Sequence, residues 1–319
     1  MTGYVVRRIL VLVPTWLGIS FFAFALASLA PGDPAELILA RELDEPPTPA
    51  QLQAFRERFG LDDPFLVQYG RWVANAVTGD LGVSFRSGDP VFGELVSRLP
   101  ATLQIAVPGF TVAVLLALLV GVVSAVRRNS LIDHGSRVGA LLADSVPSFV
   151  LAYLLIIVFS VVLGLLPVAG RGGPEHLVLP VLTLALATTA SLMRLTRSSL
   201  LEVLGERYVR TARAMGLPER WVILRHALRN ALIPVVTFAA LIFGGFVTGT
   251  VIVETVFAWP GVGKFVVDSI FDRDYAIIQG FVVFTGTVFV LINLAVDLLY
   301  VRLDPRIRLA VDAERGRGG

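Results

Sequence analysis

The stretch that decides the fold covers residues 103–126 and reads LQIAVPGFTVAVLLALLVGVVSAV. It contains no Asp, Glu, Lys or Arg. A helix of about 20 apolar residues is long enough to cross the hydrocarbon core of a bilayer. Backbone groups in lipid must satisfy their hydrogen bonds within the segment, which only a helix achieves on its own. The stretch therefore predicts a membrane-spanning helix.

Five further apolar runs of similar length occur in the chain of 319 residues: 9–30, 138–166, 177–193, 231–257 and 277–301. The chain is 55% hydrophobic and 16% charged, whereas soluble globular domains have roughly 45–50% apolar and about 25% charged residues. We predict an all-α integral membrane protein with six transmembrane helices. A water-soluble enzyme is disfavoured, because only residues 31–102 could form a sizeable domain outside the membrane.

The residue types also disfavour several kinds of catalytic site. The chain has no cysteine, which excludes disulfides and thiol chemistry. Its three histidines are far apart and outside the apolar runs: His134, His176 and His226. We therefore expect no metal site and no cofactor. A serine hydrolase is disfavoured because the G-x-S-x-G motif is absent.

The sequence WPGVGKF at 259–265 contains a Gly-Lys pair, as phosphate-binding loops do. A phosphate-binding loop needs a glycine at position 258 and a hydroxyl residue at 265. The chain has Ala258 and Phe265 there. We expect that the chain binds no nucleotide and is not itself an enzyme.

The distribution of basic residues predicts the topology. The N-terminus, the loop after residue 126, the segment 194–230 and the C-terminal tail together hold 18 of the 27 Lys and Arg residues. Cytoplasmic loops carry such an excess, so we place both termini and the segment 194–230 in the cytoplasm. This topology explains the basic charge without nucleic acid. A signal peptide is disfavoured for the first run, because its apolar part is longer than the 7–15 residues that are usual.

Residues 31–102 are acidic and are predicted to lie outside the cytoplasm. Thr48 can cap a helix that begins at Pro49, and Gly60 can end it. A second apolar set follows: Phe65, Leu66, Tyr69, Trp72 and Val73. The loop is interpreted either as a cap on the outer helix ends or as a lid or docking surface for an external partner.

The segment 198–230 is too polar for lipid, and it is patterned as two short cytoplasmic helices. Gly216 provides a left-handed stop for the first, and Pro218 opens the second. Spacing places four residues on one face of the first helix: Tyr208, Thr211, Ala212 and Met215. Arg207, Arg210 and Arg213 flank that face. The pattern fits docking into a groove of another protein, and it equally fits a helix lying on anionic lipid.

The residues 206–216, ERYVRTARAMG, followed by HALRNALIP at 226–234, resemble the cytoplasmic coupling loop of bacterial ABC importer permeases. The chain is most similar to the dipeptide, oligopeptide and nickel branch. The resemblance extends over nearly the whole chain through these motifs: APGDP at 30–34, FGLDDP at 59–64, GDLG at 79–82, RLPAT at 98–102, WPGVG at 259–263, RDY at 273–275 and DPR at 304–306. The chain departs from the general Glu-Ala-Ala pattern, with Arg210-Thr-Ala212 instead, which favours the peptide branch.

This resemblance implies a type I ABC importer permease in the bacterial inner membrane. The implied divisions are 1–30 for the start and first helix, 31–102 for the extracytoplasmic cap, 103–309 for the permease core and 310–319 for the tail. The implied partners are a second, homologous permease subunit, which makes a heterodimer, two cytoplasmic ATP-binding subunits and an extracytoplasmic substrate-binding protein. The lipid bilayer surrounds the assembly.

The same resemblance assigns coupling to the ATPase subunits to eight residues: Glu206, Tyr208, Arg210, Thr211, Ala212, Arg213, Ala214 and Gly216. A bulky charge at Ala212, or Gly216→Val, is expected to uncouple transport while the protein stays in the membrane.

Polar residues in or near the apolar runs are candidates for the translocation pathway, because such residues are costly in lipid and usually face a cavity or each other. The candidates are Asp144, Ser145, Pro147, Ser148, Glu254, Asn293 and Asp297. Hydrogen bonding between helices is the alternative role for all of them. Gly245 and Gly249 are interpreted as a helix-packing pair.

The expected substrate is a dipeptide or an oligopeptide, with nickel or glutathione as alternatives within the family. A proton-coupled secondary carrier remains a further alternative, in which Asp144, Glu254 or Asp297 would relay protons. The absence of an internal repeat disfavours the carrier.

Overall fold

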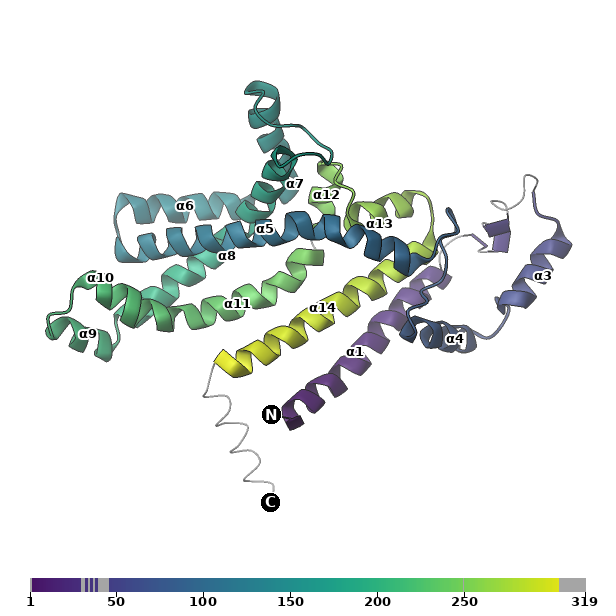
Figure 1. Cartoon of the computed structure of the whole chain (residues 1–319), viewed down its shortest axis with the longest axis horizontal. Coiled ribbons are helices and arrows are strands. Elements are labelled where there is room, and N and C mark those ends of the chain that lie inside the picture. The colour runs from purple at the N-terminus through teal and green to yellow at the C-terminus, as the bar shows by residue number, and fades with distance from the viewer. Residues whose placement is uncertain are drawn as a thin grey trace, which may run out of the picture. The chain divides into compact units, whose positions relative to one another are not determined.

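The computed structural model describes residues 2–29, 32–33, 35–36, 38–39, 46–248 and 250–303. The helical segments, with η for a π-helical one, are α1 (Thr2–Ser28), α3 (Pro49–Phe59), α4 (Phe65–Val77), α5 (Val91–Val126), α6 (Leu131–Ser145), α7 (Ser148–Leu155), η1 (Ile156–Val162), α8 (Glu175–Leu204), α9 (Arg207–Ala214), α10 (Glu219–Trp221), η2 (Val222–Ala227), α11 (Leu228–Thr248), α12 (Val251–Val256), α13 (Val262–Phe271) and α14 (Tyr275–Leu303) (Figure 1). The chain divides into two compact units: residues 1–101 with 261–290, and residues 102–260 with 291–319.

In the part of the chain that the structure describes, each of the six apolar runs lies largely on helices. Within the described residues, four helices are long and apolar enough to cross a membrane: Val91–Val126, Glu175–Leu204, Glu219–Phe246 and Tyr275–Val296. A bent pair, Leu131–Ser145 with Ser148–Val162, is a fifth candidate, and Leu12–Ser28 is a shorter apolar helix. The all-α membrane fold predicted from the sequence is confirmed.

The run 138–166 is not one straight helix, as its length suggested. Helices α6 and α7 meet at 106°. Val146, between them, has an extended backbone, with φ −96° and ψ 120°. A proline has no N–H to donate and disfavours the helical conformation of the residue before it. Pro147 therefore ends α6 and starts α7, and the run 231–257 is likewise divided, into α11 and α12.

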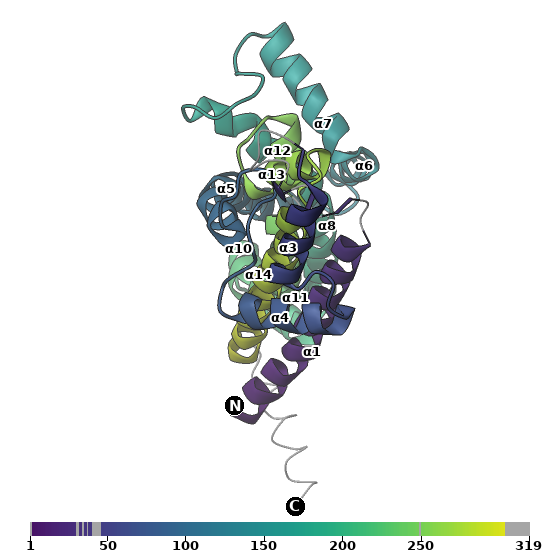
Figure 2. The ribbon, with the colours of Figure 1, turned by 90° about the vertical axis from the view of Figure 1, so that its right-hand side faces the viewer.

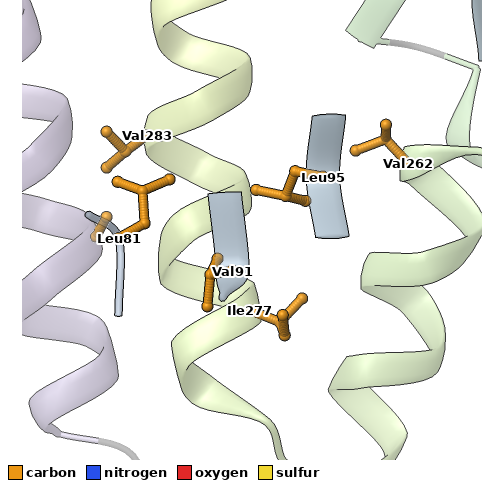
Figure 3. Packing of buried hydrophobic residues seen from close by; sticks show 7 residues of the cluster. Leu81, Val91, Leu95, Val262, Ile277 and Val283 are labelled. Atoms are coloured by element: carbon orange, nitrogen blue, oxygen red, sulfur yellow. The ribbon is translucent and has the colours of Figure 1, made fainter. Parts of the chain in front are cut away.

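The core of the first unit joins α1, the start of α5, α13 and α14. Its buried residues are Ala23, Leu81, Val91, Leu95, Val262, Ile277 and Val283, of which six are labelled in Figure 3. The Nε1 of Trp16 donates to Oγ1 of Thr287 at 2.9 Å and ties α1 to α14. Helix α14 lies close to the start of α5 at Gly280, where the lack of a side chain makes room for Val91. A Cβ at this position would collide with Val91.

Two features fix the loop before α5 in this unit. The helix predicted at Pro49 is confirmed: Thr48 and Gln51 form a capping box, and Gly60 ends the helix with φ 62°. Farther along, the buried carboxylate of Asp274 accepts a hydrogen bond from Oγ of Ser84 at 2.5 Å and bonds from the N–H groups of Phe85 and Arg86, both at 3.2 Å. The turn after residue 83 is thereby bound to the start of α14.

Helix α8 is the centre of the second unit, where it packs against α6, α7 and α11. The main buried cluster comprises Ala117, Ala140, Ala190, Leu192, Met193, Val235 and Ala239. Small residues permit close packing of α5 on α8: a Cβ at Gly121 of α5 would lie only 2.7 Å from Cβ of Thr196 on α8.

A buried ion pair joins α6 to α8 in the second unit. Asp133 is 0% exposed and accepts from Nε and Nη2 of Arg197 at 2.7 and 2.8 Å. It also accepts from Oγ of Ser124 on α5 at 2.6 Å and from the N–H of Asn129 at 2.9 Å. This one carboxylate therefore joins its own helix, α6, to α5, to α8 and to the turn between α5 and α6.

Replacing Asp133 by alanine is expected to destabilise the protein by about 3–5 kcal/mol, because the Arg197 guanidinium would stay mostly buried without its partner. The measurement is thermal unfolding of the purified protein in detergent. Asp268→Ala is the matched control, since Asp268 pairs with Lys264 but is half exposed, and such pairs contribute about 0–1 kcal/mol. Equal unfolding temperatures for the two variants would contradict this role of Asp133.

Candidate functional site

The segment 198–230 folds as predicted into a short helix, α9, followed by a turn and a second helical stretch. Glu206 precedes α9, and Gly216 has φ 79°. No heavy atom lies within 4 Å of a Cβ built at Gly216, so its need for glycine is purely conformational. The Nδ2 of Asn230 donates to Oη of Tyr208 at 2.7 Å and links α9 to α11.

One face of α9 is packed against its own chain. Val209 and Ala212 are buried in a cluster with Val222, which Val203 and Leu204 complete from the end of α8. Ala212 is 3% exposed. The prediction that it belongs to the surface offered to a partner is therefore not supported: spacing placed it beside Thr211, but the helix turns it inward with Val209.

The exposed side of α9 carries the remaining candidates: Glu206, Tyr208, Arg210, Thr211, Arg213 and Ala214. Arg213 donates from Nη2 and Nε to the Glu219 carboxylate, at 2.7 and 3.1 Å, and this contact raises the pKa of the Arg213 guanidinium above its usual value. The pair braces α9 against α10 and leaves Arg210 and Thr211 as an exposed polar surface.

The second group of candidates lies where α6 and α7 meet. Asp144 accepts from Nη2 of Arg194 on α8 at 2.5 Å. This pair is partly open, with side chains 39% and 40% exposed. Arg194 also donates from Nη2 to Oγ of Ser191 at 3.3 Å, while its Nη1 is buried without a hydrogen-bond partner. The sequence analysis did not name Arg194 as a pathway candidate, because it follows an apolar run and was counted with the basic residues of the segment 194–230.

An open cavity of about 430 Å³ lies beside this ion pair, in the second unit. Its polar lining is Ser148, Thr188 and Ser191, and its apolar lining includes Phe238, Ile242 and Phe246. Ser148 was predicted, whereas Thr188 and Ser191 were not. Ser191 connects the cavity to Arg194, so hydroxyls, rings and one guanidinium converge at this place.

The other pathway candidates are not part of this cavity. Ser145 donates to the Leu141 carbonyl within α6, and Pro147 shapes the bend. Glu254 is buried and accepts from the hydroxyls of Thr102 and Thr250 at 2.7 and 2.8 Å. Its contacts tie α5 to α12, which corresponds to the alternative role, hydrogen bonding between helices.

The structure describes only part of two further predictions: the pathway candidates on the last helix and the helix-packing glycine pair. Asn293 is half-buried on α14, whereas the side chain of Asp297 and the whole of Gly249 lie outside the described residues. Within the described ranges, no group of three His, Cys, Asp or Glu residues could hold a metal ion.

Comparisons with known proteins agree with this architecture. The family described as "Binding-protein-dependent transport system inner membrane component" matches residues 117–309, and the corresponding N-terminal family matches residues 1–106. The "Glutathione transport system permease protein GsiC" of Escherichia coli strain K12 is 44% identical over 97% of this chain and 99% of its own length. The protein of the same name from Shigella flexneri serotype 5b is 43% identical over the same shares.

Two solved structures share the fold. "Crystal structure of an amino acid ABC transporter with histidines" has a TM-score of 0.53 at 14% identity, covering 66% of this chain and 94% of the other. The MetNI methionine ABC transporter, in inward-facing conformations, has a TM-score of 0.53 at 22% identity, covering 66% of this chain and 96% of the other.

Ala212→Glu is expected to reduce the amount of folded protein, because it places a carboxylate in an apolar cluster at a cost of several kcal/mol. Ala214→Glu introduces the same charge on the exposed side of the same helix and should leave the amount unchanged. The measurement is the monodisperse peak in size-exclusion chromatography of detergent-solubilised membranes. Equal recovery of the two variants would show that Ala212 is not packed as the structure has it.

Proposed function

Because the chain belongs to the family of binding-protein-dependent transport system inner membrane components, we propose that it forms half of the translocation pathway of an ATP-driven importer for small peptides with free carboxylates. Glutathione, a tripeptide with two carboxylates, is within this class, and relatives that are 44% identical over 97% of the chain are named as glutathione permeases. Dipeptides and oligopeptides remain in it as well. The observation that carries the proposal is the exposed side of α9 on a loop fixed to α8 and α11.

The coupling step follows from how α9 is held. Val209 and Ala212 pack on η2 and the end of α8, and Tyr208 is bonded to Asn230 of α11. A force applied to Arg210 or Thr211 therefore reaches both helices without bending a flexible linker. ATP binding would draw the two ATPase subunits together, carry α9 with them and bias α8 and α11 toward the outward-open arrangement.

The partners proposed are a second, homologous permease, two ATPase subunits that bind α9 and its counterpart, and an extracytoplasmic binding protein that delivers substrate. Both termini are proposed to lie in the cytoplasm. Residues 31–102 form the extracytoplasmic part, and residues 103–309 form the core of the pathway.

Substrate contact is assigned to the cavity beside α7 and α8. The rings of Phe238 and Phe246 suit the variable side chains of peptides, and the hydroxyls of Ser148 and Thr188 suit the peptide backbone. Every peptide with a free C-terminus has a carboxylate, whatever its sequence. The guanidinium of Arg194 can bind that carboxylate. The carrier alternative is less well supported, because Asp144 already binds a guanidinium and Glu254 is enclosed by hydroxyl donors.

The proposal is tested by tagging the cytoplasmic tail, solubilising membranes gently and quantifying what co-purifies. We expect one homologous permease and two ATPase chains, with ATPase activity stimulated by a substrate-loaded binding protein. Arg210→Glu is the specificity variant: it should insert normally and fail to retain the ATPase chains, because it reverses the charge of the exposed α9 surface. A chain that purifies alone and transports peptide in liposomes under a proton gradient would establish the carrier instead.

The role of Arg194 is tested by comparing Arg194→Gln with Asp144→Asn in reconstituted complexes. A charge-assisted hydrogen bond contributes about 1.5–3 kcal/mol, so Arg194→Gln should slow uptake of a free-carboxylate peptide by roughly tenfold or more. Asp144→Asn breaks the same ion pair but keeps the cation, and should retain uptake. If both variants lose uptake equally, the pair is structural only.

A further inference from the structure

Helix α4 lies across α1, rather than alongside it. The rings of Phe65, Tyr69 and Trp72 all lie 5.4–5.9 Å from the ring of Phe24 on α1, centre to centre. Phe65 and Trp72 are about 10 Å apart along the helix axis, at 1.5 Å per residue. Figure 2 shows α4 passing across α1.

The crossing point lies below the outer end of α1. Tyr69 donates from Oη to the Leu17 carbonyl at 3.1 Å, and its Oη also lies 2.9 Å from Oγ of Ser20. Phe24 and Leu17 precede the last residue of α1, Ser28, by about 6 and 17 Å along the axis. Both residues belong to the apolar run 9–30, with Leu17 near its middle and Phe24 nearer its end. In the topology proposed above, α4 therefore packs on the part of α1 that lies in the outer leaflet.

One face of α4 is polar, and the turn that precedes the helix contacts its first part, at Gln68 and Arg71, while Asn75 farther along is exposed. Gln68 donates from Nε2 to the carbonyls of Leu61 and Asp63, both at 2.8 Å. Arg71 pairs with the Asp63 carboxylate at 2.6 Å and donates to the Phe59 carbonyl. This face is therefore joined to the turn between α3 and α4.

The opposite face of α4 is apolar and open. Leu66, Val73 and Val77 fall on one stripe, on the other side of the helix from Gln68, Arg71 and Asn75 at 3.6 residues per turn. Leu66 and Val77 are 69% and 72% exposed.

This stripe continues onto α1. The Phe65 ring, next to Leu66, contacts the Phe21 ring, which contacts the ring of Phe22, with centroid separations of 5.7 and 5.9 Å. Phe22 is 67% exposed and is part of a helix that the apolar run places in lipid. The exposed surface of α4 is thus continuous with a surface of α1 that the apolar run predicts to face acyl chains.

We infer that α4 is an interfacial membrane helix, embedded in the outer leaflet with Leu66, Val73 and Val77 on acyl chains and its polar face toward water. Its crossing direction, its depth near Phe24 and its opposed faces are those of a helix that lies in the membrane plane, with its apolar face about 5–10 Å into the headgroup boundary. The inference does not depend on what the protein transports. It divides the region 31–102 into an aqueous part and a part held in lipid.

The natural absence of cysteine permits a direct test with single-cysteine variants of the full complex. Leu66→Cys and Val77→Cys report on the stripe, and Asn75→Cys, on the polar face of the same helix, is the matched control. Intact cells are treated with a membrane-impermeant maleimide. The purified complexes, labelled with a small fluorophore in detergent, are then placed in nanodiscs with lipids brominated on the acyl chain.

We expect the two stripe cysteines to react roughly tenfold or more slowly than the Asn75 variant, since an apolar environment excludes the reagent and raises the thiol pKa. Brominated acyl chains should quench fluorophores at positions 66 and 77 more than one at 75. Rapid labelling of the stripe in cells would overturn the inference in favour of water. Slow labelling without quenching would overturn it in favour of a protein partner.

Discussion

The fold depends on the rule that a charge within a membrane protein must be matched by another charge or by hydrogen-bond donors. Asp133 meets it most completely, with four bonds from Arg197, Ser124 and the backbone of Asn129. Its removal would leave a guanidinium mostly buried and separate α6 from both α5 and α8. Glu254 follows the same rule with two threonine hydroxyls. The positions of the helices are consequently set by a few polar contacts within a largely apolar interior.

Two arginines of α8 each pair with a carboxylate of α6, but the two ion pairs differ in how easily they can be broken. Arg197 reaches a fully buried carboxylate, whereas three residues earlier Arg194 reaches one that is 39% exposed. Partly exposed pairs are worth little in free energy, and buried pairs are hard to break. The end of α6 near Asp133 is thus fixed to α8, while the end near Asp144 can be released. In the proposed transport cycle, α6 would therefore stay fixed to α8 at the Asp133 end and move at the Asp144 end.

The sequence predicted those features that depend on local physics. Apolar length predicted the helices, Thr48 and Gly60 predicted the ends of α3, and Gly216 predicted the left-handed turn after α9. Pro147 was named only as a pathway candidate, and the bend of 106° between α6 and α7 was not predicted. Pairings such as Asp144 with Arg194, or Asp274 with the turn at Ser84, join residues 50 and 190 positions apart. No periodicity in one sequence contains that information.

The misplacement of Ala212 has a more specific cause. On a helix of eight residues, the apolar arc contains Val209 and Ala212, and the adjacent arc contains Tyr208, Thr211 and Ala212 again. Spacing alone cannot decide which arc faces the protein, because a small side chain fits both. Val222, brought back by the turn at Gly216, decides it by burying the first arc. A surface that transmits force must be stiff, so in the proposed coupling step the burial of Ala212 would let the exposed Arg210 and Thr211 act on α8 instead of deforming their own loop.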